Sequence, residues 1–309
     1  MFEHIDGCVR PEDSGLGKDH PKEIDVETGN FFVEQRTGIE RRKIGIIGLG
    51  SVGSALKAVL SYFYEVHGYD IIGNHDWSKI LSCESVFICV QTPEGIDGRL
   101  DCSRVNDVLN RLQRSNFSGV TVIKSTLKVG FMDEARRNYP GLRLVYSPEF
   151  MSEKNAFIWT ANPDRIVLTG NEDDMDYVQS LYYWADGAKI IRTDDRSAEI
   201  GKLAHNSYIA LKVTFTNTME KISIMGKASP DDVMKIVYTD RRVGNSAHLE
   251  PHKGPYGGKC VPKDTAELIN AFGEAAKLLK VADEFNDAII RLEGIVTQEN
   301  HQDSRKYLR

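Results

Sequence analysis

Short apolar runs separated by longer helical stretches dominate the pattern of hydrophobic and polar positions between residues 43 and 170. The runs cover residues 43–47, 85–90, 120–124, 143–146 and 165–168. Runs of this length that alternate with helical patterns are typical of βαβ units around a mostly parallel sheet. We therefore expect an α/β protein whose residues 43–195 form an N-terminal, Rossmann-like domain with a doubly wound sheet.

Beyond this region the apolar positions take up a helical period. Between Ser197 and about Gly226 they form one stripe, which comprises Ile200, Leu203, Ala204, Ser207, Leu211 and Phe215. One long helix is expected there. Further on, Asp264 and Glu267 have the spacing of a capping box that opens a helical run to about Gln298, with a break near Lys280. Residues 196–298 should thus form a mainly helical central domain.

The two ends of the chain differ from this middle part. Residues 1–42 are polar and glycine-rich, with only residues 31–33 as an apolar anchor, so we expect a partly disordered extension. Residues 299–309 form a polar tail. The packed part of the chain is therefore expected between residues 43 and 298.

The overall composition is that of an ordinary globular protein, with 41% hydrophobic and 27% charged residues. The net charge of −6 argues against binding to nucleic acid or to an anionic membrane, because both need a basic face. No apolar run is long enough to span a bilayer, and none resembles a signal peptide. The five cysteines lack the paired spacing of a disulfide framework or a metal site, so we expect a cytoplasmic protein without a bound metal.

A glycine motif follows the first apolar run directly. Gly48, Gly50 and Gly53 have the spacing of a dinucleotide-binding turn between a strand and a helix. The first glycine permits the turn, the second lets a pyrophosphate approach the backbone, and the third lets the helix pack on the strand. Amides at the start of that helix, including the amide of Val52, would then bind the phosphates.

Asp70 strengthens the dinucleotide hypothesis. It ends a second expected strand, residues 66–70, about 20 residues beyond the glycines, where an acid binds the ribose hydroxyls. Because a carboxylate repels a 2′-phosphate, NAD is expected rather than NADP. A glycine turn that binds no ligand is the alternative.

The second candidate for chemistry is the thiol of Cys260, in the segment Gly257-Gly258-Lys259-Cys260-Val261-Pro262-Lys263-Asp264. The glycines let a substrate come close, and the neighbouring lysines together with a helix N-terminus favour the reactive thiolate. By itself this segment fits a nucleophile and an inert, buried cysteine equally well.

Taken in order, the motifs of this chain resemble those of the UDP-glucose/GDP-mannose dehydrogenase family from Lys43 to about Gln298. The motifs that carry the resemblance are the glycine turn, Gln91-Thr92-Pro93 with Asp97-Gly98, Lys124-Ser125-Thr126, Ser147-Pro148-Glu149-Phe150 with Glu153, Asn162-Pro163-Asp164-Arg165, Lys202 with Asn206, Arg242-Val243-Gly244, and the cysteine segment. The resemblance implies NAD as the cofactor and a nucleotide sugar as the substrate. It implies the four-electron oxidation of a primary alcohol to a carboxylate, as in a UDP-glucose 6-dehydrogenase of polysaccharide biosynthesis.

In this reaction Cys260 would attack the aldehyde formed first, and the thiohemiacetal would lose the second hydride to a fresh NAD before water hydrolyses the thioester. Lys202 and Asn206, four residues apart on one helix face, would stabilise the oxyanion, although by spacing alone they could face solvent. Glu149 resembles the family's acid–base carboxylate, which activates water. Asp264 would cap its helix and orient Lys202 or the water.

The resemblance also implies which residues bind the ligands. The cofactor is expected to contact the glycine turn and Asp70, together with Thr92, Thr126, Glu153 and Lys263. The substrate is expected to contact Glu149, Phe150, Lys202, Asn206, Arg242, Tyr256 and Gly257. Thr126 should also act near the reaction centre by hydrogen-bonding water or substrate, or else bind only local backbone. The alternative for Glu149 and Glu153 is that they are surface carboxylates that bind no ligand.

The chain departs from the family pattern at Arg309, where members usually continue into a third α/β domain that binds the nucleotide. Two other functions therefore stay open. One is an NAD-binding regulatory module without activity, and the other is a two-electron dehydrogenase of the β-hydroxyacid type, in which Cys260 has no role. By resemblance the central helix builds a homodimer. An apolar stripe could serve that contact or pack within one chain, and it comprises Leu268, Ala271, Phe272, Ala275 and Leu279.

Overall fold

The computed structural model describes residues 41–96, 98–152, 155–185, 187–240, 243 and 247–293, and the short antiparallel strands β1 (Ile24–Asp25) and β2 (Asn30–Phe31). The described residues fall into two compact units. The larger unit contains residues 41–214 and 255–293, and the smaller one includes residues 215–254. The helix α7 (Asp195–Met225) has residues in both.

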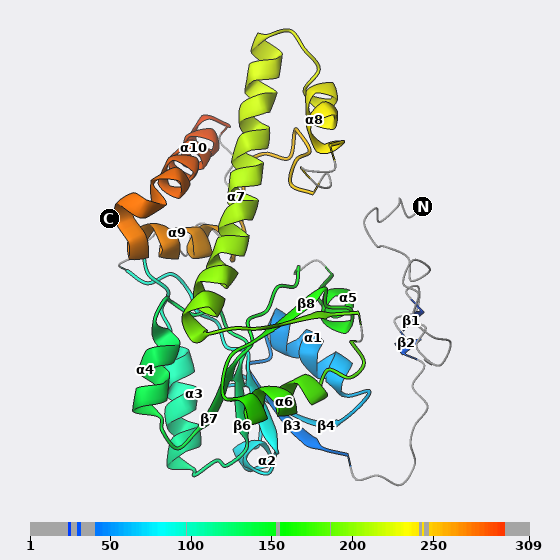
Figure 1. Ribbon diagram of the computed structural model, residues 1–309, viewed down its shortest axis with the longest axis vertical. Coiled ribbons are helices and arrows are strands. Elements are labelled where there is room, and N and C mark those ends of the chain that lie inside the picture. Colours follow the sequence, from blue (N-terminus) through cyan, green and yellow to red (C-terminus); the bar gives the residue numbers. More distant parts are fainter. Residues whose placement is uncertain are drawn as a thin grey trace. The chain divides into compact units, whose positions relative to one another are not determined.

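A five-stranded parallel sheet lies at the centre of the larger unit (Figure 1). Its strand order is β4 (Glu65–Tyr69), β3 (Lys43–Ile47), β5 (Ser85–Ile88), β6 (Val120–Ile123) and β7 (Arg143–Tyr146). The register pairs Ile47 with both Tyr69 and Ile88, so the carboxyl ends of the strands lie level along one edge. The strand order reverses at β3, which places a crevice for a ligand at that edge. The expected α/β, Rossmann-like fold class is confirmed.

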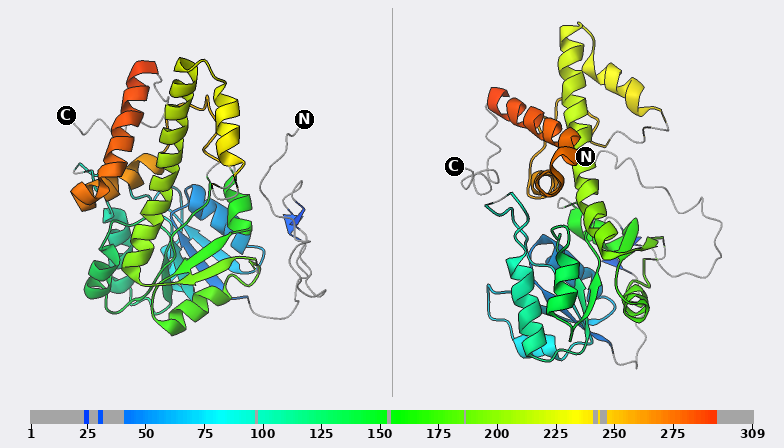
Figure 2. Two further views of the ribbon diagram at one scale, coloured as in Figure 1. Left: turned by 45° about the horizontal axis from the view of Figure 1, so that its top comes forward. Right: turned by 60° about the vertical axis from the view of Figure 1, so that its left-hand side comes forward.

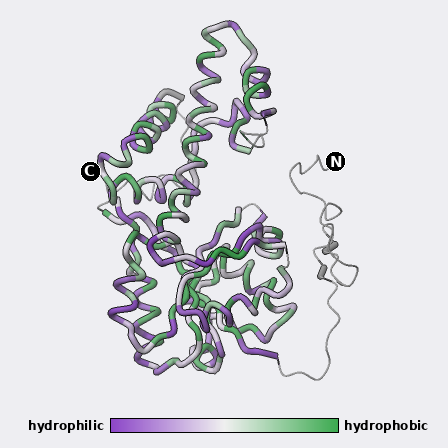
Figure 3. The backbone as a smooth tube through the Cα atoms, in the orientation of Figure 1, coloured by the Kyte–Doolittle hydropathy of each residue, from purple (hydrophilic) through white to green (hydrophobic). Residues whose placement is uncertain are grey.

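Helices cover both faces of this sheet. Figure 1 shows α3 (Ser103–Arg114) and α4 (Phe131–Asn138) side by side against one face and α1 (Ser51–Leu60) against the other, while α2 (Trp77–Leu81) contacts β4. Strands β5 and β6 are buried at every position, and the sheet is hydrophobic over much of its length in Figure 3. Because the apolar side chains hold the strands on both faces, the loops at the carboxyl ends start from fixed points.

Two further strands, β8 (Arg165–Leu168) and β9 (Lys189–Arg192), form a separate parallel pair. An antiparallel bridge between Tyr146 and Thr169 connects this pair to the end of β7. The helix α5 (Ala156–Ala161) precedes β8 and packs on α1, and α6 (Glu172–Ser180) lies between β8 and β9 in the chain. The run at 165–168 is thus a strand, as expected, but it lies outside the five-stranded sheet.

The long helix expected between Ser197 and Gly226 is confirmed as α7, but its buried face differs from the predicted apolar stripe. Ala204 is exposed and Phe215 is 43% exposed, whereas Glu199, Lys202 and Asn206 are buried. Hydrophobicity alone misplaces this face because the helix buries polar side chains that have hydrogen-bond partners, such as Glu199, which accepts from the amides of Gly130 and Met132.

The helical run after the cysteine segment consists of α9 (Val261–Phe272), the 3₁₀ helix η3 (Gly273–Ala276) and α10 (Lys277–Glu293), which follow one another in Figure 2. The predicted capping box is wrong, because the helix begins after Cys260 and Asp264 lies inside it. Pro262 explains the earlier start, since proline suits the first turn of a helix. The break lies at Gly273, whose φ of +51° ends α9, and not near Lys280.

The smaller unit contains the end of α7 and the helix α8 (Pro230–Tyr238). The hydroxyl of Ser229 caps α8 by accepting a hydrogen bond from the amide of Asp232. Of the described helices, none is both long enough and apolar enough to cross a membrane.

Candidate active site

The glycine turn lies between β3 and α1 with the geometry that its spacing predicts. Gly48 has a φ of +92°, and a Cβ on it would lie 2.8 Å from the backbone of Cys89. A Cβ on Gly53 would lie 1.8 Å from the carbonyl oxygen of Gly48, so the first turn of α1 packs against the loop only with glycine there. Gly50, at the N-cap of α1, is exposed and has no atom near its missing side chain. The open backbone at Gly50 leaves room for a phosphate group.

Asp70 follows β4 and turns its carboxylate toward this loop. Its Oδ2 accepts a hydrogen bond of 2.7 Å from the amide of Leu49, and its Oδ1 accepts one of 3.0 Å from the amide of Ile72. These backbone hydrogen bonds hold the pKa of Asp70 below its usual value, so the group is an anion at neutral pH. An oriented carboxylate beside a glycine turn fits the ribose of NAD.

Four of the predicted residues follow strands of the central sheet at its carboxyl edge. Thr92 follows β5 and is buried, Thr126 follows β6 and is half-buried, and Glu149 and Phe150 follow β7. The structure therefore brings them to the edge where an open α/β sheet binds its ligand. Val52 lies in the first turn of α1, where the amides have no partner within the helix.

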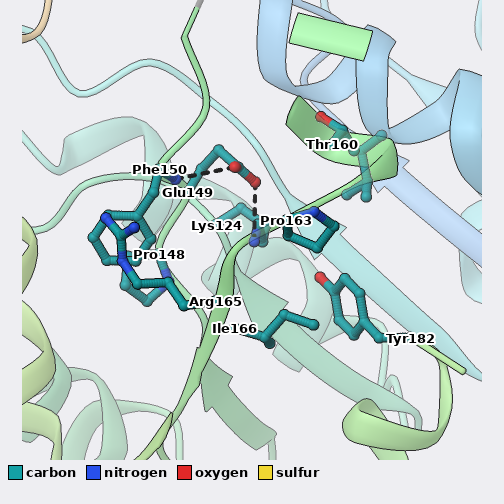
Figure 4. A pocket seen from close by; sticks show the side chains of 10 residues that line it. Lys124, Pro148, Glu149, Phe150, Thr160, Pro163, Arg165, Ile166 and Tyr182 are labelled. Atoms are coloured by element: carbon teal, nitrogen blue, oxygen red, sulfur yellow. Dashed lines mark hydrogen bonds and ion pairs between the residues drawn. The ribbon is translucent and has the colours of Figure 1, made fainter. Parts of the chain in front are cut away.

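A buried ion pair joins Glu149 to Lys124, as Figure 4 shows. The Nζ atom of Lys124 lies 3.1 Å from Oε2 of Glu149, and the two side chains are 6% and 19% exposed. Oε1 of Glu149 accepts hydrogen bonds of 3.0 Å from the amides of Phe150 and Met151. Burial would raise the pKa of Glu149, but the charge of Lys124 and these hydrogen bonds bring it below its usual value. Glu149 is therefore ionised, as a general base must be.

Lys124 is a residue that the sequence interpretation missed, although it begins the Lys124-Ser125-Thr126 motif. Burial would lower its pKa, but the negative charge of Glu149 raises it, so the lysine stays charged. A lysine directly after a mostly apolar strand, residues 120–123, was the available signal, since a buried lysine needs a counter-charge.

The ion pair opens onto a pocket at the ends of β6 and β7. The residues that line the pocket are Leu56, Lys124, Pro148, Glu149, Phe150, Thr160, Pro163, Arg165, Ile166 and Tyr182. Two cations lie over the ring of Phe150. The guanidinium carbon of Arg165 is 4.1 Å from the ring centroid, and Nζ of Lys202 is 5.1 Å from it. Phe150 thus connects the pocket, which it lines together with Arg165, to the face of α7 that carries Lys202.

Cys260 differs from the other cysteines that the structure describes. Cys83, Cys89 and Cys102 are buried, and burial raises the pKa of the first two to about 12 and of the third to about 11. Cys260 is exposed and forms the N-cap of α9, next to the open backbone of Gly258. Its exposure does not fit the alternative of a buried core cysteine, and a helix N-terminus favours a thiolate.

Asp264 links the thiol helix to α7. Its carboxylate accepts a short hydrogen bond from Nδ2 of Asn206 and one of 2.6 Å from Nζ of Lys263. Lys202, one turn before Asn206, is 7% exposed; burial lowers its pKa, while the negative charges of Asp264 and Cys260 oppose that shift. The structure thus brings four of the predicted catalytic residues together, and Asp264 orients Asn206 instead of capping its own helix.

Other predicted ligand residues have partners within the chain or lie elsewhere. The hydroxyl of Tyr256 donates to Asp283 at 2.7 Å, and its backbone exchanges two hydrogen bonds with Asn286 of α10. Tyr256 thereby fixes the start of the cysteine segment, with Gly257 half-buried beside it. Glu153 and Arg242 lie outside the described residues.

Two family models match the chain. Residues 73–186 match the NAD binding domain of the UDP-glucose/GDP-mannose dehydrogenase family, and residues 196–288 match its central domain. Among curated proteins, the chain is 28% identical to the UDP-glucose 6-dehydrogenase of Streptococcus pneumoniae, over 78% of this chain and 71% of that protein. It is 30% identical to the UDP-glucose 6-dehydrogenase AglM of Haloferax volcanii, over 69% of this chain and 54% of that protein.

Solved structures share the fold. A UDP-glucose dehydrogenase from Pyrobaculum islandicum superposes with a TM-score of 0.73 at 23% identity, over 84% of this chain and 71% of that one. The 3-hydroxyisobutyrate dehydrogenase of Mycobacterium tuberculosis superposes with a TM-score of 0.59 at 15% identity, over 82% of this chain and 94% of that one. The fold is thus shared by a UDP-glucose dehydrogenase and a 3-hydroxyisobutyrate dehydrogenase.

Proposed function

The chain belongs to the UDP-glucose/GDP-mannose dehydrogenase family and its cofactor is NAD, and from this premise we propose that it oxidises the primary alcohol of a nucleotide sugar to a carboxylate through a thioester on Cys260. The observation that carries this proposal is the placement of an exposed thiol at the N-cap of α9, beside the buried cluster of Lys202, Asn206 and Asp264. A substrate resembling UDP-glucose agrees with the names of the relatives.

The cofactor fits the residues present. A Cβ at Gly48 or Gly53 would fill the turn, and Asp70 presents an oriented carboxylate for the ribose hydroxyls. When bound, NAD would supply the hydride acceptor for the two oxidations. Thr92 and Thr126, which follow β5 and β6, are proposed to contact the cofactor. Lys263 is proposed to contact it after leaving Asp264, to which its ammonium group is bound here.

The protein residues would act in sequence on one carbon atom. In the first oxidation the carbon gives up a hydride to the cofactor and its hydroxyl gives up a proton to water, with Lys202 and Asn206 stabilising the charge on the oxygen. The Cys260 thiolate then adds to the aldehyde carbon, and the aldehyde oxygen takes up a proton from water. The thiohemiacetal gives up the second hydride to a fresh NAD and returns this proton to water, which leaves a thioester. Glu149, ionised beside Lys124, takes a proton from the water that hydrolyses the thioester.

The test is the stoichiometry of NADH formed per nucleotide sugar consumed, measured with candidate UDP- and GDP-sugars. We expect a ratio of two. A ratio of one would instead identify a two-electron dehydrogenase of the β-hydroxyacid type, in which Cys260 is idle. Intact NAD binding without any turnover would identify a binding or regulatory module.

We also propose a homodimer through the central helix. In the smaller unit, α7 and α8 expose apolar side chains, which are Phe215, Ile222, Ile224, Met225 and Ile236. In the larger unit, the predicted apolar stripe is divided, since Leu268 is buried in the core and Phe272 is 41% exposed. Light scattering after gel filtration measures the mass, and a monomer would refute this assembly.

A further inference from the structure

Glu267 is a carboxylate that the proposed chemistry does not use, yet it is completely buried. It lies on α9, seven residues after Cys260, and its side chain is 0% exposed. Arg99 donates to both of its oxygens from Nε, at 3.0 and 3.1 Å, and its Nη2 lies 3.0 Å from Oε1. The amides of Leu100, at 2.8 Å, and of Val129, at 3.3 Å, complete the set of donors.

These donors come from two loops that matter for the site. Arg99 and Leu100 belong to the loop that follows β5, a few residues after Thr92. Val129 belongs to the loop that follows β6, three residues after Thr126. One side chain therefore connects the helix that carries the thiol to both strand-end loops that are placed to hold the cofactor.

A second contact holds α9 against the loop that follows β5. The Nδ2 atom of Asn270, one turn beyond Glu267, donates to the carbonyl oxygen of Gly98 at 3.0 Å. Gly98 has a φ of +69°, which favours glycine, and a Cβ on it would lie 2.5 Å from that nitrogen, so a side chain at position 98 would displace the Asn270 amide from this hydrogen bond. The two contacts fix both the rotation of α9 and its position along its own axis.

A buried ion pair is a poor device for stability alone, because desolvation offsets most of its attraction and apolar replacements often do as well. It specifies geometry, since a carboxylate with four donors in fixed directions has one acceptable position. With a rise of about 1.5 Å per residue, Glu267 lies roughly 10 Å along the helix from Cys260. A shift of α9 at Glu267 is thus carried to the thiol by a rigid helix.

We propose that Glu267 is a positioning residue for the second oxidation: through Arg99, Leu100 and Val129 it sets where Cys260 lies relative to the cofactor-binding loops. This inference rests on the proposed function. The first oxidation uses Lys202 and Asn206, which lie on α7, and α9 reaches Asn206 through the hydrogen bond to Asp264. The second oxidation uses the thiol that α9 itself carries, so loss of Glu267 should slow the second hydride transfer much more than the first.

The test compares Glu267→Gln with the wild-type chain and with Glu284→Gln, which makes the same chemical change at an exposed carboxylate of α10. The glutamine amide would direct two hydrogens at groups that are themselves donors. We expect the first hydride transfer within about twofold of wild type and the second slowed by roughly 10- to 100-fold, the range for a small misplacement of a reacting group. Trapped aldehyde should accumulate, and the ratio of NADH to sugar should fall from two toward one. Glu284→Gln should match wild type.

Two further measurements keep the test decisive. Arg99→Lys keeps the charge but loses the fork of donors, so it should shift the ratio in the same direction if Glu267→Gln fails to fold. The rate at which iodoacetamide alkylates Cys260 with and without NAD reports the position of the thiol even without turnover. We expect NAD to protect the thiol in wild type and less so in both variants.

The outcomes distinguish the proposed function from the positioning role of Glu267. A wild-type ratio other than two contradicts the proposed function, and the alkylation measurement then still decides about Glu267. A wild-type ratio of two with an unchanged ratio and unchanged protection in the folded variants overturns the positioning role. An equal loss of both hydride transfers overturns it as well, because it indicates a general structural role.

Discussion

The dinucleotide end and the thiol end of this site are built in different ways. At the dinucleotide end, Gly48, Gly53 and Asp70 come from one short stretch of chain, and the site depends on backbone that carries no side chains. At the thiol end, buried polar groups meet from distant segments, since Asn206 and Asp264 are 58 residues apart. Adding a side chain should therefore disrupt the dinucleotide end, whereas removing a hydrogen-bonding or charged partner should disrupt the thiol end.

The largest expected effect is at the thiol end. Cys260→Ser should lower the rate of carboxylate formation by at least about 10³-fold, as for other lost nucleophiles, because a hydroxyl is a much weaker nucleophile than a thiolate. The aldehyde from the first oxidation should still form. Measuring NADH and trapped aldehyde together checks both statements.

The matched control is Cys83→Ser, since Cys83 is buried just before β5 and the charges near it are those of Glu65, Lys43 and Glu84, none of which is a predicted site residue. This variant should still form two NADH per nucleotide sugar consumed. An unchanged yield of carboxylate in Cys260→Ser would remove the covalent route.

At the dinucleotide end, Gly53→Ala and Gly50→Ala should behave differently. The Cβ at position 53 would overlap the carbonyl oxygen of Gly48, so this variant should lose both melting temperature and NAD affinity, the latter by about 10- to 100-fold. The Cβ at position 50 meets no atom of the protein, so this variant should keep its melting temperature and lose only NAD affinity. Calorimetry of folding and of NAD binding measures the two effects separately.

Gly141→Ala is the control for these variants, because Gly141 is exposed and its Cβ would meet only the end of the Gln113 side chain. Neither the melting temperature nor the NAD affinity should change in Gly141→Ala. Loss of melting temperature in Gly50→Ala would contradict the open site for a phosphate.

Lys124→Met should leave a buried carboxylate without its counter-charge. The expected cost is about 3 kcal/mol in the free energy of unfolding at neutral pH. Since the pKa of Glu149 is lowered on folding, its stabilising contribution is complete above its unfolded value near 4.5 and is lost as the pH falls through the lower, folded value. In the variant the pKa of Glu149 should rise, so the acid limb of the pH–rate profile should move to higher pH.

The control here is Lys253→Met, which breaks an exposed pair with Glu250 at 3.5 Å. Exposed pairs contribute little, so the melting temperature and the pH–rate profile should stay as in wild type. An unmoved acid limb in a folded Lys124→Met variant would show that Lys124 does not control Glu149.

The parts of this protein that sequence reasoning predicts well are those specified by neighbours along the chain. The alternation of apolar runs and helical stretches identified the α/β fold, and the spacing of the glycines and Asp70 identified the dinucleotide turn, because strand, turn and helix are local structures. The long helix α7 was predicted for the same reason. Its buried face was not, since burial of Glu199 and Lys202 depends on which segments pack against them.

Local patterns also misled where a distant partner decided the role. Asp264 and Glu267 have the spacing of a capping box, yet their carboxylates bind Asn206 and Arg99 and the helix starts earlier. Lys124 stands in a recognised motif, but its importance depends on Glu149 at the end of the next strand.

The amino-acid sequence by itself determined the sheet, the helices, the glycine turn and the order of the motifs, because each depends on residues close together in the chain. Only the tertiary structure decided which charges are neutralised, which of the four described cysteines is exposed, and how α9 is held against the loops of the sheet. The physical reason is that the cost of burying a charge depends on partners that the fold brings from far along the chain.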